Sequence, residues 1–182
     1  MKLNDKEIRQ AFIKRLQNRK PEPKRIIEEL AVDSGNAIAD IVTVSTDLHC
    51  FEIKGENDKI GRLERQSKSY DMAFRKVTLI TTKNHLNKAL ILAPIHWGII
   101  EAKIVGEKIK FVYHRKVSIN PNFCKYTALQ TLWKEEMIRI ATKKSATPMK
   151  KNITREIISS TLAKHSTKKE LSELIAEQLN IR

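Results

Sequence analysis

The chain has 182 residues, of which 41% are hydrophobic, so it can form one domain with a substantial core, and wholesale disorder is not expected. Its 35 Lys and Arg residues outnumber 21 Asp and Glu residues, and the net charge of +14 predicts attraction to polyanions, with nucleic acid as the first candidate. No apolar run approaches the roughly 18 residues of a membrane-spanning helix, and the polar N-terminus shows no secretory signal. We therefore expect a cytoplasmic protein that does not bind a membrane.

Residues 3–19 are predicted to form a helix, because their apolar side chains recur at helical spacing and two prolines follow. Asn4 or Asp5 is the expected N-cap. Residues 24–32 have no decisive period and fit either a helix or a strand. A turn is expected at residues 33–36, which are Asp-Ser-Gly-Asn.

The central stretch of the sequence predicts a β-hairpin. Residues 38–44 are rich in β-branched side chains, and residues 48–54 alternate in character. If residues 45–47 form the loop, counting outward along both strands places Asp40 directly opposite Glu52.

The second strand of this hairpin has two different faces. Glu52 and Lys54 project from one face, while Phe51 and Ile53 point the other way into a core. Side chains directly opposite on one face lie roughly 5 Å apart at Cβ, so Asp40 and Glu52 would repel unless a cation such as Mg²⁺ neutralised them. A one-residue shift in pairing would separate the two acids. The alternative is that Glu52 and Lys54 simply form the solvated side of a strand.

A helix is predicted to follow over residues 62–74, with the stripe Leu63, Gln66, Tyr70, Ala73 and Phe74 facing the sheet. Gln66 and Tyr70 are the polar members of that stripe. Gln66 also fits the edge of the stripe, where solvent would wet it. Four basic residues lie before, beside or behind the stripe: Lys59, Arg62, Arg65 and Lys68.

Residues 76–82 are predicted to form a strand, because they are rich in β-branched side chains, and the crossover from the hairpin predicts that this strand pairs in parallel within the same sheet. The other expected elements are a helix over 85–90 capped by Asn84, a strand over 90–93, and a hairpin of residues 97–105 and 108–115. Trp97 is expected to pack in the core, although His96-Trp97-Gly98 also suggests an active-site reading.

After residue 120 the spacing of apolar residues predicts helices only. Helices are predicted over 126–142, 153–165 and 167–179, with a basic, Pro-containing linker over 143–152. We accordingly divide the chain into a core of residues 1–120 and a helical C-terminal extension of residues 121–182. The extension could contact DNA, but a lid or a dimer contact is favoured, because Glu170, Glu173 and Glu177 on its last helix would repel phosphate.

Asp40, Glu52-Ile53-Lys54 and the Gln66-to-Tyr70 helix together resemble the PD-(D/E)xK nuclease superfamily, in its RecB-like branch. The resemblance covers about residues 24–82, and Ala39 stands where the superfamily's proline would be. The pattern is also similar to a small bacterial and phage family within that fold. The resemblance implies an α/β protein with a restriction-endonuclease-like mixed sheet flanked by helices.

The resemblance further implies a site for Mg²⁺ or Mn²⁺ made by Asp40, Glu52 and the backbone carbonyl of Ile53. The resemblance also implies an acidic residue upstream of Asp40 that helps to bind the ion. Glu29 is the expected residue, and Glu28 is the alternative. Lys54 would orient the attacking water and neutralise charge at the phosphate.

Gln66 and Tyr70 would then fix Lys54 or touch the phosphate, and Lys59, Arg62, Arg65 and Lys68 would hold the DNA backbone without reading its sequence. The expected function is hydrolysis of phosphodiester bonds, with DNA favoured as the substrate. The alternatives are a non-catalytic nucleic-acid-binding protein and a basic subunit of a DNA-processing complex, and a homodimer is also open.

Overall fold

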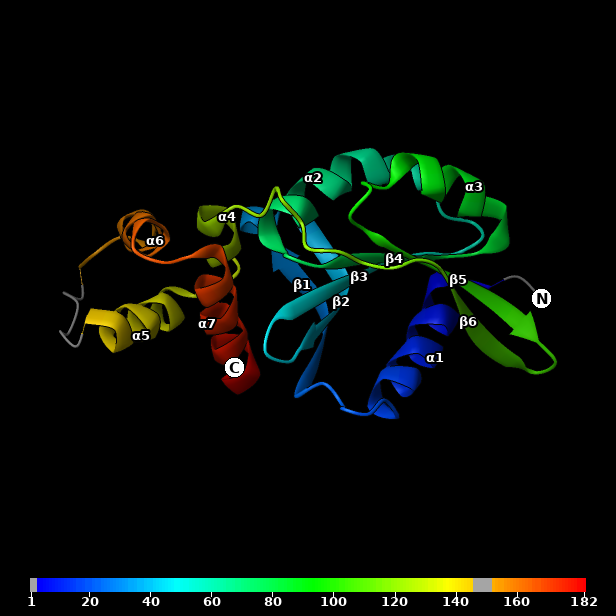
Figure 1. The fold of residues 1–182 in the computed structure, drawn as a ribbon, viewed down its shortest axis with the longest axis horizontal. Helices are drawn as coiled ribbons and strands as arrows, with labels where there is room; N and C mark the ends of the chain where they lie inside the picture. Colours follow the sequence, from blue (N-terminus) through cyan, green and yellow to red (C-terminus); the bar gives the residue numbers. More distant parts are fainter. Residues whose placement is uncertain (1–2, 146–151) are drawn as a thin grey trace.

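The computed structural model describes residues 3–145 and 152–182, and its centre is one six-stranded sheet (Figure 1). The strands are β1 (Arg25–Val32), β2 (Ala37–Val44), β3 (Leu48–Lys54), β4 (Val77–Thr81), β5 (Gly98–Val105) and β6 (Lys108–Arg115). The helices are α1 (Asp5–Gln17), α2 (Leu63–Ala73), α3 (Lys83–Leu92), α4 (Lys125–Leu129), α5 (Lys134–Ser145), α6 (Arg155–Lys164) and α7 (Lys168–Ile181), with short 3-10 turns η1 (Asp33–Gly35) and η2 (Ile60–Arg62).

The order of the strands across the sheet is the order of the strands along the chain. β1, β2 and β3 are antiparallel neighbours, β3, β4 and β5 run parallel, and β6 returns antiparallel to β5. Parallel neighbours need crossover connections, and α2 and α3 supply them. The mixed α/β sheet flanked by helices that the sequence predicts is confirmed, and residues 24–32, left open between helix and strand, form β1.

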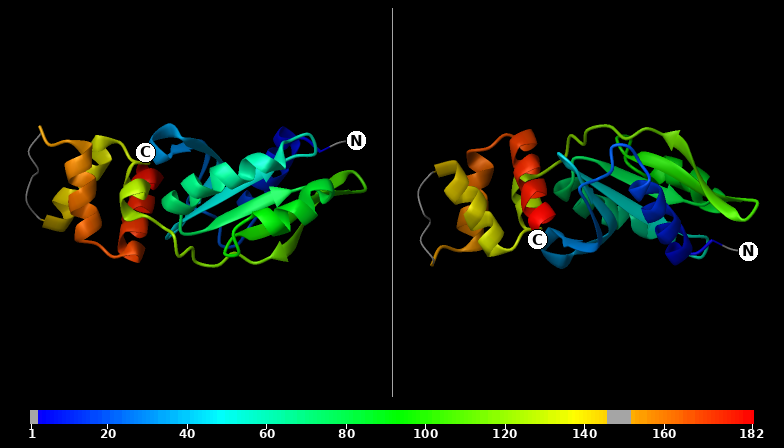
Figure 2. Two further views of the ribbon diagram at one scale, coloured as in Figure 1. Left: turned by 90° about the horizontal axis from the view of Figure 1, so that it is seen from above. Right: turned by 90° about the horizontal axis from the view of Figure 1, so that it is seen from below.

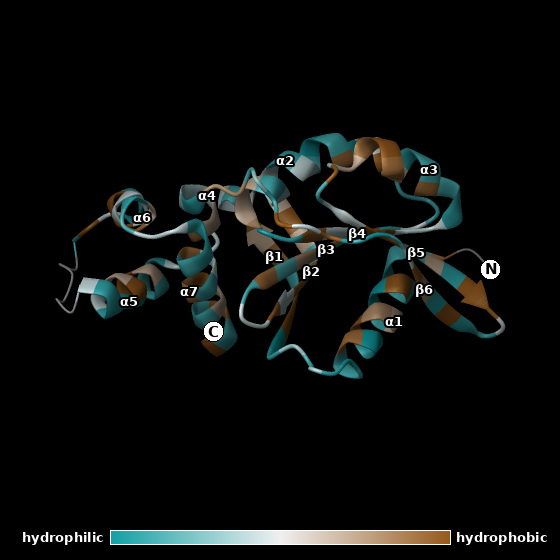
Figure 3. Cartoon of the chain, in the orientation of Figure 1, coloured by the Kyte–Doolittle hydropathy of each residue, from teal (hydrophilic) through white to brown (hydrophobic). Residues whose placement is uncertain are grey.

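Helices cover both faces of the sheet, with α1 on one side and α2 and α3 on the other (Figure 1). Phe12 of α1 packs in one core cluster with Phe51 and Ile53 of β3. Tyr70 of α2 belongs to a second cluster on the opposite face, with Cys50 of β3. Hydrophobic and hydrophilic residues are mixed along both the strands and the helices (Figure 3).

The helices α4 to α7 gather at one end of the sheet, as both views of Figure 2 show. Their buried residues, such as Leu129 and Leu171, belong to the same core cluster as Tyr70 and Val44 of the sheet layer. Arg25 of β1 donates a hydrogen bond to the Leu179 carbonyl at 3.1 Å, which ties α7 to the edge strand. The C-terminal helices therefore share a continuous hydrophobic core with the α2 side of the sheet.

The predicted helix over 126–142 is wrong, because the chain forms two helices, α4 and α5, with a break at residues 130–133. Arg155 of α6 donates hydrogen bonds to the carbonyls of Gln130 (3.0 Å) and Leu132 (2.9 Å). At the start of α5, the Trp133 N–H donates to Glu136 Oε2 at 2.7 Å. These contacts satisfy backbone groups at the break that a continuous helix would have paired internally.

The predicted strand over residues 90–93 is also wrong, because residues 90–92 are the last turn of α3. Short apolar runs do not distinguish a strand from a helix, and this one stays largely exposed, with Ile91 82% accessible. Thr82 rather than Asn84 is the N-cap of α3. Residues 143–145 of the predicted linker lie in α5, and residues 146–151 lie outside the described residues. None of the described helices is long and apolar enough to cross a bilayer.

Gly55 follows β3 directly and allows a close approach to the start of α1. A Cβ atom added there would lie 2.8 Å from the Asp5 nitrogen, whereas one added at Gly61 would meet nothing within 4 Å. We expect Gly55→Ala to lower the free energy of unfolding by about 1–3 kcal/mol, because backbone must move to make room. Urea unfolding measures this change, and Gly61→Ala is the matched control, expected to be close to neutral. Equal effects of the two substitutions would contradict the close approach.

Candidate functional site

The predicted hairpin of β2 and β3 is present with the predicted register. Val44 pairs with Leu48, and the ladder continues outward to Ile41 and Phe51. Asp40 and Glu52 are the next positions beyond that last pair, so the count made from the sequence is consistent with the observed pairing. The two acids lie where the hairpin ladder ends.

Glu52 and Lys54 project from the same face of β3 and pair with each other. Lys54 Nζ lies 2.6 Å from Glu52 Oε1, and both residues are buried, with Glu52 only 1% accessible. Strand alternation sends Phe51 and Ile53 into the core on the α1 side. The alternative interpretation, a solvated strand face, is therefore wrong, because Glu52 and Lys54 form a buried ion pair.

Tyr70 of α2 completes this buried group. Its hydroxyl lies 2.7 Å from Glu52 Oε2 and 2.7 Å from the Ile38 carbonyl oxygen, and it donates its single proton to these two acceptors. Burial and the neighbouring charge of Glu52 raise the pKa of Tyr70 well above its usual value, so the hydroxyl remains a donor. Both carboxylate oxygens of Glu52 thus have a defined partner.

Asp40 sits at the rim of the same group. Its Oδ2 accepts a hydrogen bond from the Ile53 backbone N–H at 2.7 Å, which bridges β2 and β3 beyond their last ladder pair. Burial, followed by the charge of Glu52, raises the pKa of Asp40 to about 7. The charge of the nearby Glu52 therefore adds to burial in disfavouring the ionisation of Asp40.

Arg9 of α1 is a site residue that the sequence analysis missed. Its guanidinium lies 3.0 Å from Asp40 Oδ1, 3.1 Å from Asp5 Oδ2 and 3.4 Å from Glu29 Oε1. The only local signal was the spacing of Asp5 and Arg9, four residues apart on a predicted helix. Arg9 therefore supplies a positive charge beside Asp40, while Lys54 supplies one beside Glu52.

Glu29 lies at the periphery of the site. Its neighbours in β1 pair with the neighbours of Asp40 in β2, so Glu29 occupies the position across from Asp40. Its side chain is 73% accessible and reaches the group only through Arg9. The backbone of Glu29 has a φ of 54°, a conformation uncommon for a residue other than glycine. Glu28, the alternative upstream acid, is exposed and pairs with Ile41.

Gln66 of α2 is half-buried, which fits both the stripe and its edge. Its Oε1 atom is buried, and in the part of the chain that the structure describes it has no hydrogen-bond partner. An unpaired buried amide oxygen is costly and uncommon, so this atom is free to accept a bond from a ligand or a water. The four basic residues expected to hold a nucleic-acid backbone, namely Lys59, Arg62, Arg65 and Lys68, are all exposed.

The oxygen donors here match the preference of Mg²⁺, which takes one or two carboxylates and completes its shell with water. Asp40, Glu52 and the carbonyl of Ile53 would supply such a set, and burial, followed by the charge of Glu52, raises the pKa of Asp40 to about 7. Arg9 and Lys54 now hold these carboxylates, and no group of three or more His, Cys, Asp or Glu residues within 3–145 and 152–182 is arranged for a metal. The chemistry of the donors therefore fits the ion, while a bound ion would have to share the carboxylates with those two cations.

His96 and Trp97 belong to a different, structural group. Trp97 Nε1 donates to Asp71 Oδ1 at 2.7 Å, and His96 Nε2 lies 2.9 Å from the same oxygen. Trp97 is fully buried, so the packing interpretation of this motif is confirmed. The sequence analysis did not identify Asp71 as the partner of His96 and Trp97, although Asp71 follows Tyr70 directly on α2.

Fold and site together define an α/β protein with a mixed sheet and a buried Glu-Lys-Tyr group beside a half-buried aspartate. The chain belongs to the family described as bacteriophage P4 protein cII, whose family model matches residues 1–180. Protein cII of Enterobacteria phage P4 is 26% identical over 112 residues, which is 62% of this chain and 42% of that protein. The chain thus matches less than half the length of this curated relative.

A solved structure, a protein of unknown function from Silicibacter pomeroyi, aligns over 70% of this chain and 84% of its own length. Its sequence identity is 12% and its TM-score is 0.41. Neither of the two names describes an activity.

Proposed function

We propose that this protein is a metal-dependent nuclease of the PD-(D/E)xK type that hydrolyses phosphodiester bonds, with DNA as the favoured substrate. The observation that supports this most strongly is the buried group of Glu52, Lys54 and Tyr70 beside Asp40 at the end of the β2–β3 hairpin. The restriction-endonuclease-like assignment of the sheet belongs to the same proposal. Its support is the antiparallel hairpin followed through α2 by a parallel strand.

Each residue of the group has a role that follows from its contacts. Tyr70 is a permanent donor and fixes one oxygen of Glu52, so the carboxylate keeps a single orientation. Lys54 holds the other oxygen, and its ammonium group is placed to orient a water and to offset charge that grows on the phosphate. Gln66 contributes an acceptor without a partner among the described residues, suited to hold that water or the substrate.

Asp40, Glu52 and the Ile53 carbonyl would hold Mg²⁺ or Mn²⁺. When bound, such an ion lowers the pKa of a coordinated water and stabilises the negative charge of the transition state. Arg9 is the residue that must yield, because its guanidinium now holds Asp40 Oδ1. We infer that Arg9 turns toward Asp5 and Glu29, which it already contacts, when Asp40 takes another partner.

The substrate class follows from charge. The net charge of +14 favours a polyanion, and exposed cations just before and within η2 and α2 would contact phosphates without reading bases. These cations are Lys59, Arg62, Arg65 and Lys68. We place the reaction in the cytoplasm of a host cell, and the role of α4 to α7 as a lid or dimer contact stays a prediction.

A second candidate is a non-catalytic nucleic-acid-binding protein, alone or as a basic subunit of a DNA-processing complex. The observation that favours it is the internal neutralisation of both acids, Asp40 by Arg9 and Glu52 by Lys54. In this case the ion pairs would be purely structural, and binding would depend on salt but not on a divalent metal.

The test is a cleavage assay of the purified chain with plasmid, single-stranded DNA and RNA. We expect DNA to be cut with Mg²⁺ or Mn²⁺ and to stay intact with EDTA, because phosphodiester hydrolysis depends on the ion at Asp40 and Glu52. Asp40→Ala is expected to abolish cutting while salt-dependent DNA binding persists. Binding without any cutting in either metal would favour the second candidate, and cutting that survives both EDTA and Asp40→Ala would reject the proposed site.

A further inference from the structure

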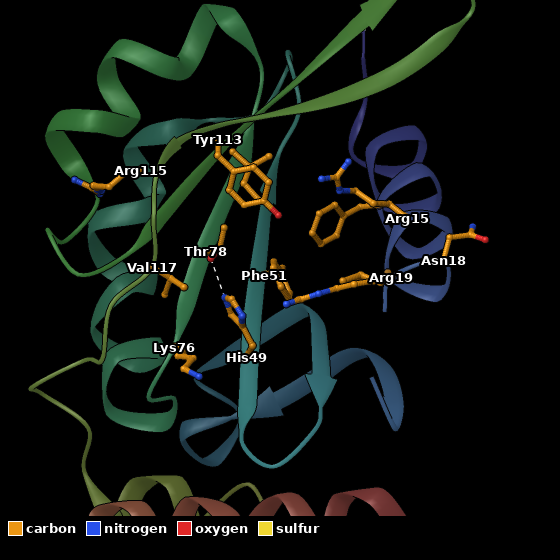
Figure 4. Close-up of a pocket in the computed structure, with 13 residues that line it drawn as sticks. Arg15, Asn18, Arg19, His49, Phe51, Lys76, Thr78, Tyr113, Arg115 and Val117 are labelled. Atoms are coloured by element: carbon orange, nitrogen blue, oxygen red, sulfur yellow. Dashed lines mark hydrogen bonds between the residues drawn. The ribbon is translucent and has the colours of Figure 1, made fainter. Parts of the chain in front are cut away.

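A second site lies on the opposite face of the sheet, between α1 and the strands β3, β4 and β6. A cavity of about 730 Å³ opens there, within the usual range for small-molecule pockets (Figure 4). Phe51 and Thr78 form part of its floor, and they pair across β3 and β4 on the face that Glu52 does not share. The cavity is therefore separate from the candidate nuclease group.

Cations and no acids line this cavity. Arg15, Arg19 and Lys76 border it, and no Asp or Glu residue does so in the described chain. None of these three cations forms an ion pair with another described residue. A fourth cation, Arg115, is directed away, because it donates to the carbonyls of Trp97, Ala93 and Pro94. Three uncompensated positive charges around one hollow favour an anionic ligand.

His49 lies at the base of the cavity, near two of these cations. Burial, followed by the charges of Lys76 and Arg19, lowers the pKa of His49 to about 3, so the ring is neutral. Its Nε2 lies 2.8 Å from Thr78 Oγ1, and its ring stacks on Phe51 with centroids 4.1 Å apart. These contacts fix the imidazole as a rigid wall and leave the anion to the arginines and the lysine.

The upper wall of the cavity offers a flat surface. Tyr113 is 59% accessible and points into the hollow in Figure 4. The guanidinium of Arg15 lies 5.9 Å from the centre of the Tyr113 ring. Aromatic rings and guanidinium planes are the surfaces on which nucleobases stack. A phosphate group and a planar base can therefore be held at two ends of the same cavity.

We propose that this cavity binds a nucleotide, with its phosphate on Arg19 and Lys76 and its base against Tyr113 and Arg15. A neighbouring hollow of about 590 Å³ shares Arg19, His49 and Lys76 with this cavity, and Asp47 and Glu173 line it as well, so its charges are mixed. The ligand is then either a free nucleoside monophosphate or the phosphorylated end of a strand. This site does not depend on the proposed nuclease activity.

Calorimetric titration of the full chain in EDTA tests this site without any cleavage. The ligands are deoxyadenosine 5′-monophosphate, deoxyadenosine, inorganic phosphate, and a deoxyadenosine dinucleotide with or without a 5′-phosphate. We expect the monophosphate to bind at least about tenfold more tightly than either deoxyadenosine or phosphate, because charged hydrogen bonds and stacking act together. If the 5′-phosphorylated dinucleotide binds more tightly than the monophosphate and the unphosphorylated dinucleotide, the ligand is a strand end. If the monophosphate binds as tightly as the 5′-phosphorylated dinucleotide, the ligand is a free nucleotide.

Variants separate this site from diffuse attraction to a basic protein. Arg19→Gln and Lys76→Gln are each expected to weaken monophosphate binding about tenfold or more, and Tyr113→Ala to weaken it by a similar factor. Lys14→Gln removes the same charge from an exposed position of α1 outside the cavity, and we expect it to bind as the unaltered chain does. The absence of saturable nucleotide binding, or an equal loss in Lys14→Gln and Arg19→Gln, would overturn the proposal.

Discussion

Lys54→Gln and Glu52→Gln are each expected to reduce metal-dependent DNA cleavage roughly a hundred- to a thousandfold, the loss typical when one preorganised electrostatic group is removed. Lys54 and Glu52 lie 2.6 Å apart in a buried pair, so either change removes a charge that nearby water cannot replace. Glutamine keeps a hydrogen-bonding group of similar length in both cases. Initial rates on a plasmid substrate measure the effect.

Two controls make this result interpretable. Lys103→Gln removes one positive charge from an exposed position on β5 and should leave cleavage unchanged. Thermal unfolding followed by circular dichroism shows whether each variant is folded at the assay temperature, because splitting a buried ion pair can itself destabilise a protein. A folded Lys54→Gln variant that loses less than about tenfold in rate would remove Lys54 from the mechanism.

Asp40→Asn is expected to change how stability depends on pH. The pKa of Asp40 is raised from 3.8 to about 7, so the folded state holds a proton that the unfolded state releases at lower pH. The stability that this proton provides is complete below pH 3.8 and is lost as pH rises through about 7. Asparagine cannot ionise, so above pH 7 the variant should be more stable than the unaltered chain, by on the order of 4 kcal/mol.

Urea unfolding at several pH values, without divalent metal, measures this difference. The difference in free energy of unfolding between the two proteins should shrink as pH falls below about 7, because the carboxyl of Asp40 then becomes protonated. Adding Mg²⁺ at high pH should stabilise the unaltered chain more than Asp40→Asn, because the ion would share the charge of Asp40. Parallel pH profiles for the two proteins would contradict the raised pKa of Asp40.

The hairpin at the centre of the site could be predicted closely from sequence. The loop at residues 45–47 is short, and a strand's period of two leaves little freedom once one pair is fixed. Val44 and Leu48 do pair, and the faces of β3 separate Phe51 from Glu52 as alternation requires. The inward position of Tyr70 followed in the same way from helical spacing.

The errors in the fold occurred where local signals conflict with tertiary contacts. Residues 90–93 are apolar but too few to show a period, and residues 90–92 form the last turn of α3. Residues 126–142 keep a helical pattern, yet Arg155 binds carbonyls at the break between α4 and α5. Arg155 is 25 residues from Gln130 in the chain, so the local sequence pattern around Gln130 could not indicate this contact.

The sequence by itself determined the mixed α/β class, the strand register of β2 and β3, and the shared face of Glu52 and Lys54. These features depend on neighbours within a few residues, where chain geometry is fixed by the backbone. Only the tertiary structure decided that Arg9 holds Asp40, that Glu29 stays at the edge, and that a cationic cavity lies behind the sheet. Those features join side chains from α1 and from separate strands, and their meeting depends on how the layers pack.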